Sequence, residues 1–339
     1  MTSITTSAPG KCILFGEHAV VYGHPAVAVA IDQRISVRIQ PSPSGIWLLD
    51  GSELNMQRNP HIAALINKLW PKESGAPPLS IHIEGNIPRA AGLGSSAALS
   101  VAFAGALRLA RGRLMREAGS NDRVHWAEGF GSTISLTSAY DNKTGIFPDQ
   151  TLSELFHLTG PESVDEDENA ILAHSVEAIA QKGRASPMDS STCSHGGIIV
   201  ISDQQEHKLD YLYHRELTTP SGTVRWHIHE LASIAQPDDV YLVIGNTGVN
   251  APTAKQVAKV AKMLQDNPTK IEEIETIGKI ARRGIEALKR ADYAAVGRTM
   301  SENQLMLKSI GVSSPELDVL IRAATPSSLG VKLTGAGGG

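Results

Sequence analysis

The sequence contains few cysteines and no long hydrophobic run. Its 339 residues include two cysteines, Cys12 and Cys193. Two cysteines do not form a disulfide framework, and their spacing does not match a zinc site, so a reducing cytoplasm is the expected location. No apolar stretch reaches the about 18 residues that a membrane span requires, and the opening residues MTSITTSAPGKC lack the apolar centre of a signal peptide. We therefore expect a cytoplasmic protein with no membrane partner.

An excess of positive charge is also missing. Lys and Arg together number 31 and Asp and Glu number 35, which leaves a formal charge of −4. Nucleic acids and anionic membranes are both bound by clustered basic residues, so we expect neither as a partner. What is present, 41% apolar and 19% charged residues, is typical of a soluble globular protein. The length suits two domains of roughly 150 residues each.

Strand patterns and helix patterns follow one another irregularly. Residues 27–39 alternate between apolar and polar positions, which predicts two strands joined by a turn near Asp32–Arg34. The remaining predicted strands are 46–49, 79–84, 196–202, 241–245 and 330–334, and the predicted helices are 95–110, 167–181, 252–264, 271–288 and 293–310. Because no regular strand–helix–strand repeat occurs, an α+β fold is favoured over a doubly wound parallel sheet.

Two polar regions interrupt this pattern. Residues 203–239 are polar, with QQEHK early and QPDD late, and they predict a domain boundary. We place the N-terminal domain at residues 1–205 and the C-terminal domain at residues 206–339. Residues 111–150 are rich in Ser, Thr, Gly and Asn and only weakly periodic, so we expect a long loop or insertion there.

The stretch RAAGLGSSAALS combines glycines with two hydroxyls at a predicted helix start. The phosphate-loop sequence G-x-x-x-x-G-K-[ST] is absent from the chain. Gly92, Gly94 and Ala97 satisfy the dinucleotide fingerprint G-x-G-x-x-A, but no strand follows in LARGRLMREAG, so this alternative is disfavoured. Two alternatives stay open. One is a different anion-binding loop, because free amides at a helix start favour phosphate; the other is a tight turn with Ser95 or Ser96 as a helix cap.

Three further stretches carry polar side chains in unusual surroundings. In APGKCILFGEHAVVYGHPA, Lys11 lies beside apolar residues, and a lysine near phosphates acts as a point charge. His18 in the same stretch, taken alone, is typical of a buried core histidine. In ASPMDSSTCSHGG, Asp189 lies in a predicted loop, where an isolated aspartate usually forms a turn. The terminal KLTGAGGG suits either a flexible tail or another phosphate-facing loop.

Taken together and in this order, these stretches resemble the GHMP kinase superfamily, and within it the mevalonate kinase family of archaea and bacteria. PGKCILFGEHAVVYGHPA is similar to the first family motif and GNIPRAAGLGSSAA to the second, the ATP loop. SPMDSST with the following GG resembles the catalytic-aspartate loop, and GAGGG resembles the start of the third motif. The resemblance covers most of residues 4–110 and 167–339. It implies a two-domain α+β GHMP kinase fold, with an N-terminal ATP-binding domain and a C-terminal ferredoxin-like domain, and a homodimer.

The resemblance also implies a reaction, the phosphorylation of the primary 5-hydroxyl of mevalonate by ATP with Mg²⁺, in the mevalonate pathway of isoprenoid synthesis. Asp189 would be the general base, and Lys11 would contact both Asp189 and the transferred phosphoryl. The implied substrate-binding residues are Lys11, Glu17, His18, Asp189 and Thr253. GEHAVVYGHPA favours mevalonate over a sugar, because sugar kinases of this superfamily usually carry asparagine at the position of His18.

Further residues are implied for the nucleotide and the metal. The nucleotide-binding set is Ala91, Gly92, Leu93, Gly94, Ser95, Ser96, Ala97, Gly335, Ala336 and Gly337. The metal ligands would be Ser96 and Glu177. Glu177 lies 12 positions before Asp189, about one more than the resemblance leads us to expect.

The chain departs from the family pattern in two places. Residues 111–150 have no recognised counterpart, and family members continue beyond the glycine run at which this chain stops, so we expect a C-terminal domain cut short at its third glycine motif. Other functions stay open: another small-molecule kinase of the superfamily, acting on phosphomevalonate, homoserine or a sugar, or a non-catalytic ligand sensor on the same fold.

Overall fold

The structure is a computed structural model, and it describes residues 3–70, 76–116, 135–137, 149–151, 166–180, 185–219, 222–231 and 240–339. One long strand, β2 (Ala26–Pro41), organises the sheet. It pairs antiparallel with β1 (Ile4–Phe15) along nearly its whole length. Its other edge is shared, because β5 (Leu79–Gly85) pairs with its second half and β8 (Ile198–Ser202) with its first residues.

The turn that we predicted near Asp32–Arg34 is wrong, because β2 runs through it as a single strand. The polar residues in this region coincide with a register shift against β1 between Pro9 and Lys11. Asp32 and Arg34 point to solvent there. A bulge of this kind breaks the apolar alternation without ending the strand, so a period-2 pattern alone cannot distinguish it from a turn.

The sheet has the strand order β4-β3-β5-β2-β8-β10-β9, with β1 paired to β2. Its remaining strands are β3 (Leu48–Leu49), β4 (Ser52–Glu53), β9 (Asp210–Thr219) and β10 (Gly222–Glu230). The hairpin β9–β10 lies within the stretch where we predicted a domain boundary. It joins β8 through β10, so the sheet continues across residue 205. Buried Trp226 and Ile228 alternate with more polar neighbours in β10.

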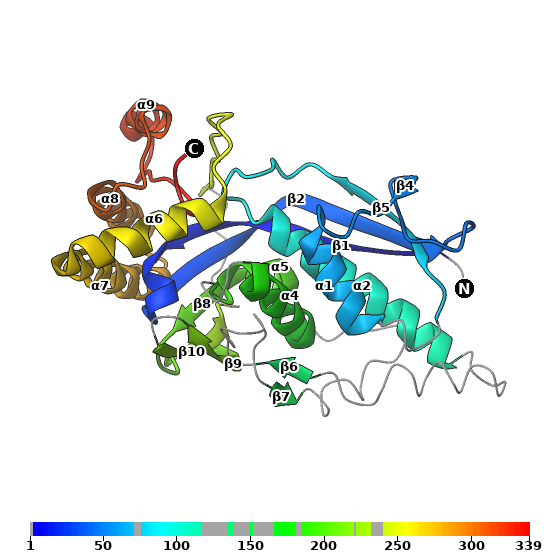
Figure 1. Ribbon diagram of the computed structural model, residues 1–339. Helices are drawn as coiled ribbons and strands as arrows, with labels where there is room; N and C mark the ends of the chain where they lie inside the picture. The colour runs from blue at the N-terminus through cyan, green and yellow to red at the C-terminus, as the bar shows by residue number, and fades with distance from the viewer. Residues whose placement is uncertain are drawn as a thin grey trace.

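Helices cover the two faces of the sheet (Figure 1). On one face lie α1 (Pro60–Leu69), α2 (Ser95–Arg116), α4 (Glu166–Ala180) and α5 (Met188–His195). Alternation along β2 explains the division. Ala26 and Ala28 face the cluster that contains Met188 of α5, whereas Val27 between them faces a different cluster that contains Ile285.

The C-terminal helices gather at one end of the sheet, coloured yellow to red in Figure 1. They are α6 (Thr253–Asp266), α7 (Ile271–Lys289), α8 (Tyr293–Ser309) and α9 (Pro315–Ala324), with short 3₁₀ helices at Ala19–Tyr22, Pro268–Lys270 and Thr325–Ser327. Helix α7 packs directly on β1, since a Cβ added at Gly284 would lie 2.5 Å from the ring of Phe15. None of the helices in the described ranges is long and apolar enough to cross a bilayer.

Most of the predicted insertion at residues 111–150 lies outside the described residues. Helix α2 extends six residues past its predicted end, to Arg116. The short strands β6 (Ser135–Thr137) and β7 (Asp149–Thr151) pair as a separate two-stranded sheet.

Two predicted strands are wrong. Residues 241–245 and 330–334 form no regular strand. Tyr241 and Val243 are 82% and 87% exposed, although the run YLVIG reads as a buried strand. A short apolar run becomes a strand only where the edge of another strand lies beside it, and its own composition cannot reveal that neighbour.

Candidate active site

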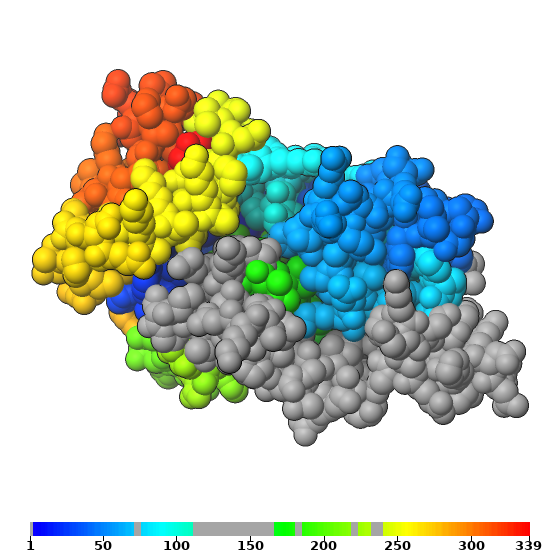
Figure 2. All heavy atoms as spheres, viewed as in Figure 1, coloured from blue at the N-terminus to red at the C-terminus, as the bar shows by residue number. Residues whose placement is uncertain are grey.

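A cleft of about 710 Å³ lies between the sheet, the start of α2 and the start of α6. In Figure 2 the C-terminal helices, yellow to red, meet the cyan residues of the N-terminal half beside this region. The predicted site residues that line the cleft are Lys11, Glu17, His18, Ala91, Gly92, Leu93, Gly94, Ser95, Ser96, Ala97, Glu177, Asp189, Thr253, Gly335 and Ala336. Segments far apart in the sequence therefore share one cavity.

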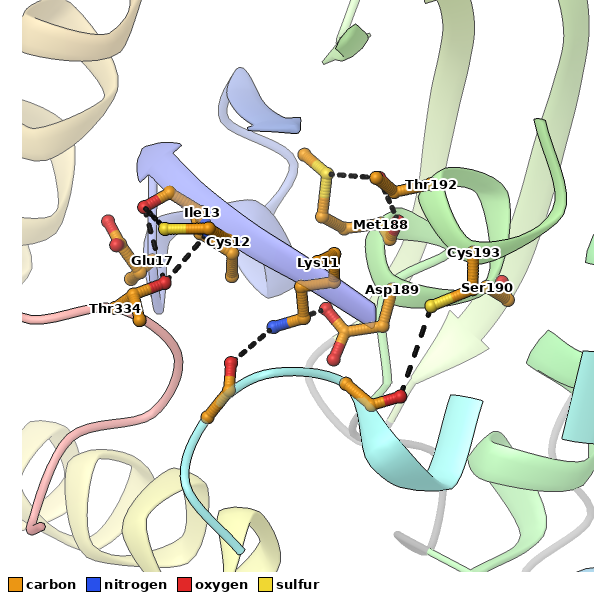
Figure 3. Close-up of polar contacts among 12 residues, drawn as sticks. Lys11, Cys12, Ile13, Glu17, Met188, Asp189, Ser190, Thr192, Cys193 and Thr334 are labelled. Atoms are coloured by element: carbon orange, nitrogen blue, oxygen red, sulfur yellow. Dashed lines mark hydrogen bonds and ion pairs between the residues drawn. The ribbon is translucent and has the colours of Figure 1, made fainter. Parts of the chain in front are cut away.

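Lys11 and Asp189, which both line the cleft, form an ion pair (Figure 3). The distance from Lys11 Nζ to Asp189 Oδ1 is 3.0 Å, and their side chains are 2% and 29% exposed. Lys11 Nζ also donates a hydrogen bond to the carbonyl of Gly92 at 3.1 Å. Burial alone would lower the pKa of Lys11, but the charge and hydrogen bond of Asp189 outweigh it and raise the pKa. Lys11 is therefore an ammonium at neutral pH.

Asp189 lies on a helix, which corrects the prediction that it sits in a loop. It occupies the first turn of α5. The helix is only eight residues long, and its composition of Ser, Thr and His is typical of loops. Ser190, Ser191 and Thr192 each return a hydroxyl hydrogen bond to a carbonyl of the preceding turn, and burial between the sheet and α4 provides the rest of its stability.

Side chains of strand β9 form hydrogen bonds that fix α5 and the segment just before it. The hydroxyls of Tyr213 and Ser191 are 2.8 Å apart. Arg215 donates from Nε to His174 Nδ1 at 3.1 Å, and His174 Nε2 lies 3.2 Å from the carbonyl of Ala185, just before the helix. Burial lowers the pKa of His174 to about 3, so the ring is neutral and donates its proton to that carbonyl. The hairpin, whose polar sequence predicted a domain boundary, thus holds the aspartate in position.

Residues 91–96, here called the glycine loop, require glycine at two positions for geometric reasons. Gly92 and Gly94 have φ values of 74° and 73°, a region that residues with a Cβ rarely adopt. A Cβ on Gly94 would lie 2.9 Å from Lys11 Cγ, and one on Gly92 would lie 2.6 Å from the carbonyl oxygen of Thr334. Helix α2 then begins at Ser95. The first amides of a helix have no partner within the helix, and they favour an anion.

Ser96 and Glu177 border the same part of the cleft. Ser96 is exposed, in the first turn of α2, whereas Glu177 of α4 is 4% exposed. Burial, followed by the negative charge of Asp189, raises the pKa of Glu177 well above its usual range, while Lys11 opposes this shift. A carboxylate disfavoured in this way gains from a bound cation. One carboxylate and one hydroxyl, both hard oxygen donors, fit magnesium that is also bound by phosphate and water.

Two of the predicted substrate-binding residues, His18 and Glu17, lie in different environments. His18 Nε2 lies 3.0 Å from the carbonyl of Ala336, and burial lowers the pKa of His18 to about 4. The neutral ring must carry its proton on Nε2 to donate there, which leaves Nδ1 as an acceptor. Glu17 is 1% exposed. One of its carboxylate oxygens pairs with Lys332 and the other accepts from Asn303 at 2.8 Å.

The remaining predicted residues lie at the C-terminal side. Thr253 is exposed at the first position of α6, and next to it the amide of Ala251 donates to the carbonyl of Ala90. Gly335 and Ala336 line the cleft, but Gly337 does not. Gly337 is buried, and a Cβ there would lie 2.2 Å from the carbonyl oxygen of Val312.

Sequence reasoning missed an apolar lobe of the cleft next to the glycine loop. Its lining residues are Ile35, Leu49, Ile62, Ile83, Ile87 and Leu99, with Asn59, His61 and Arg89 at its edge. These residues come from β2, β3, β5, α1, α2 and the connections between them. Because apolar strand residues normally signal core, and Ile62 and Ile87 are indeed buried core residues as well, no local pattern could have identified this set as a cleft lining.

Comparisons with known proteins identify this scaffold. Residues 61–139 match the family described as GHMP kinases N terminal domain, and residues 285–339 match GHMP kinases C terminal. The protein is thus a GHMP kinase. It is 31% identical to a mevalonate kinase of Methanothermobacter thermautotrophicus over 99% of this chain and 88% of that protein. It is 30% identical to a mevalonate kinase of Archaeoglobus fulgidus over 98% of this chain and 89% of that protein.

The chain belongs to the mevalonate kinase family. A solved structure supports the fold: L. major mevalonate kinase in complex with R-mevalonate is 22% identical, with a TM-score of 0.60 over 100% of this chain and 85% of that one. The family resemblance predicted from the four motifs is confirmed, as is the α+β fold of the GHMP kinases.

Proposed function

We propose that this protein transfers the terminal phosphoryl group of ATP to the 5-hydroxyl of mevalonate, giving ADP and 5-phosphomevalonate in the mevalonate pathway. The observation that carries the proposal is the ion pair between Lys11 and Asp189, 3.0 Å apart in a cleft beside the glycine loop. Full-length similarity to archaeal mevalonate kinases supports the choice of substrate. By the same family resemblance, we propose a cytoplasmic homodimer.

Asp189 is the proposed general base. Its carboxylate forms an ion pair with Lys11, and an aspartate carboxylate is a weak base. A weak base suffices, because in a loose phosphoryl-transfer transition state the alcohol proton can leave late. The substrate oxygen forms its bond to the terminal phosphorus while the bond from phosphorus to the bridging oxygen of ADP breaks. The hydroxyl proton passes to Asp189.

Lys11 and the glycine loop are proposed to stabilise the charge on the moving phosphoryl group. The ammonium of Lys11 is buried and held by two partners, so it requires no reorganisation when charge develops. Amides at the start of α2 bind the phosphates that stay with ADP. His18, with Nδ1 as an acceptor, and Thr253 are proposed to orient the substrate alcohol. The apolar lobe lined by Ile62 and Ile83 suits the adenine ring.

Ser96 and Glu177 are proposed to hold Mg²⁺ beside the phosphates, where the ion supplies charge neutralisation. The raised pKa of Glu177 has a consequence. A proton and a cation compete for the same carboxylate, so Mg²⁺ affinity should rise with pH, with release of a proton, over the range in which Glu177 titrates. Calorimetry in buffers of different ionisation enthalpy measures that proton. A Ser96→Ala variant with an unchanged Mg²⁺ titration would remove Ser96 from the ligand set.

A coupled ADP-release assay tests the substrate. Purified protein with ATP and Mg²⁺ is offered mevalonate, phosphomevalonate, homoserine and galactose in parallel. We expect the highest kcat/KM for mevalonate. A clearly larger kcat/KM for one of the other alcohols would reassign the enzyme within the superfamily.

A ligand sensor on the same fold is the second candidate, and Asp189 separates the two. Asp189→Ala should abolish turnover while ATP still binds, because the nucleotide is held by the loop and not by this carboxylate. Asp266→Ala, at the exposed end of α6, is the matched control and should keep full turnover. A wild-type protein that binds ATP but is as inactive as Asp189→Ala would favour the sensor.

A further inference from the structure

Residues 330–338, here called the glycine strip, run along α8 and end beside the cleft. The contact with α8 is between backbones: a Cβ built on Gly330 would lie 1.8 Å from the carbonyl oxygen of Gly297. Further on, the amide of Leu333 donates to Gln304 Oε1 at 2.9 Å. The strip has no strand partner in the described part of the chain, so contacts made by its side chains matter more than they would in a sheet.

Lys332 in the strip has a buried ammonium with a matching set of acceptors. Its side chain is 1% exposed, and it forms an ion pair with Glu17, which is also 1% exposed. The same Nζ donates to the carbonyl of Ile13 at 3.3 Å and to the carbonyl of Leu333. An ammonium has three N–H donors, and three acceptors surround it here. The three acceptors match the three donors of a lysine ammonium.

Glu17 has both carboxylate oxygens engaged within the protein. Lys332 pairs with Oε1, and Asn303 of α8 donates to Oε2 at 2.8 Å. The negative charge is therefore compensated before any ligand enters the cleft. This contrasts with the substrate-binding role that the family resemblance implied for Glu17.

The strip reaches the catalytic groups through three further contacts. Thr334 accepts a hydrogen bond from the amide of Ile13 at 2.8 Å, and Ala336 accepts from His18. The backbone of Thr334 also presses against the glycine loop, where a Cβ on Gly92 would lie 2.6 Å from its oxygen. The carbonyl of Gly92 in turn holds Lys11. A displaced strip would therefore disturb both His18 and the Gly92–Lys11 contact.

We propose that Lys332 is a positioning residue for phosphoryl transfer, acting through Glu17. The Glu17–Lys332 pair, here called the tether, holds the glycine strip so that Gly92 and His18 keep their places in the cleft. A buried ion pair contributes little net stability compared with an apolar pair of similar volume, so the main effect of the tether is on arrangement. This inference rests on the proposed function, and its test includes ATP binding so that the two can fail separately.

Two variants provide the first test of the tether. Lys332→Met leaves the carboxylate of Glu17 buried without its cation, and it should lower the thermal midpoint together with kcat. Glu17→Gln combined with Lys332→Met removes both charges and should regain most of the midpoint. If the tether positions the strip, the double variant still loses at least about tenfold in kcat/KM for ATP and in ATP affinity measured by calorimetry, because a misplaced group costs rate without unfolding the protein.

The matched control is another buried ion pair, Arg108–Glu168, whose side chains are 2% and 1% exposed. It joins α2 to α4 away from the cleft lining. Glu168→Gln combined with Arg108→Met should change stability but keep kcat, KM and ATP affinity within about twofold. A tether double variant that regains activity along with its midpoint would reduce Lys332 to a structural residue and overturn the proposal.

Glu17→Gln alone distinguishes the tether from direct substrate contact. The tether predicts that ATP affinity and mevalonate affinity fall together, because Gly92 and His18 both move with the strip. A carboxylate that only touches the substrate predicts a fall in mevalonate affinity alone, which would refute the proposal. If the wild type turned over none of the four alcohols, the proposed function would fail. ATP calorimetry on the same variants would still decide the tether.

Discussion

The two glycine-rich segments of the cleft, residues 91–96 and the glycine strip, lie against each other but are built differently. The first leads directly into α2, so free amides of a helix start face the cleft. The second leads into no helix, and side chains from Lys332 and Thr334 hold it in place. Similar composition therefore serves two roles: one segment can bind phosphate, and the other keeps that segment in position.

The difference extends to what each glycine touches. A Cβ on Gly94 would meet the side chain of Lys11, whereas a Cβ on Gly335 would meet the backbone of Gly92. Substitutions in the first segment should therefore act on the chemistry directly. Those in the strip should act through the first segment and be weaker.

The largest effect is expected from Gly94→Ala. The new Cβ would lie 2.9 Å from Lys11 Cγ and 3.1 Å from Cε, so the ammonium must move. A displacement of about 1 Å near the reacting group should lower kcat by roughly 10²-fold in the ADP-release assay. Gly45→Ala is the control. It shares a positive φ, 69°, but has no atom within 4 Å of the new Cβ, so it should lose only about 1–2 kcal/mol of stability and keep its kcat. Equal kcat in the two variants would contradict the prediction.

Acid should weaken the contact between His18 and the strip. Burial lowers the pKa of His18 to about 4 in the folded state, so the unfolded chain binds the proton first as pH falls. The stabilisation is complete above about pH 6.5 and disappears toward pH 4, an effect of up to about 3 kcal/mol. Urea denaturation at a series of pH values measures it. His18→Asn suits the φ of 62° and does not titrate, so it should flatten this slope. If the variant kept the same dependence of unfolding free energy on pH as the wild type, that dependence would come from groups other than His18.

Gly335→Ala tests the strip itself. With φ at 74° and a Cβ 2.6 Å from Gly92 Cα, the substitution should push the two segments apart and weaken ATP binding about tenfold by calorimetry. Gly311→Ala has a similar φ of 77°, and its nearest neighbour is the terminal Nζ of Lys259 at 3.8 Å. It should bind ATP normally, and weaker binding by both variants would indicate general strain.

The smallest effect is expected from Thr334→Val. It removes the acceptor for the amide of Ile13, which should lower the free energy of unfolding by about 1 kcal/mol in chemical denaturation. Thr334→Ser keeps the hydroxyl and should lose less. If valine and serine behaved alike, the hydrogen bond would contribute nothing measurable to holding the strip.

Prediction from the sequence worked best where the signal was local and long. The periodic apolar residues of α7 and α8 placed both helices within one residue of their observed bounds. It worked least well for short or neighbour-dependent elements. Helix α5 has a loop-like composition, and the hairpin β9–β10 shows apolar alternation only around Trp226. Residues 241–245 have the apolar composition of a buried strand, but they are mostly exposed and form no strand.

Some properties of the site depend only on neighbouring residues in the sequence. They are the glycines that allow positive φ, the helix start after GLG, the lysine inside an apolar strand and the aspartate among hydroxyl side chains. Each of these properties depends on a few adjacent positions, so the sequence by itself determines it. Which groups meet is a different matter. Lys11 and Gly92 are 81 positions apart, and Glu17 and Lys332 are 315 apart. Such pairs form only when the sheet and its helices bring distant backbones together, and no spacing along the chain encodes that distance.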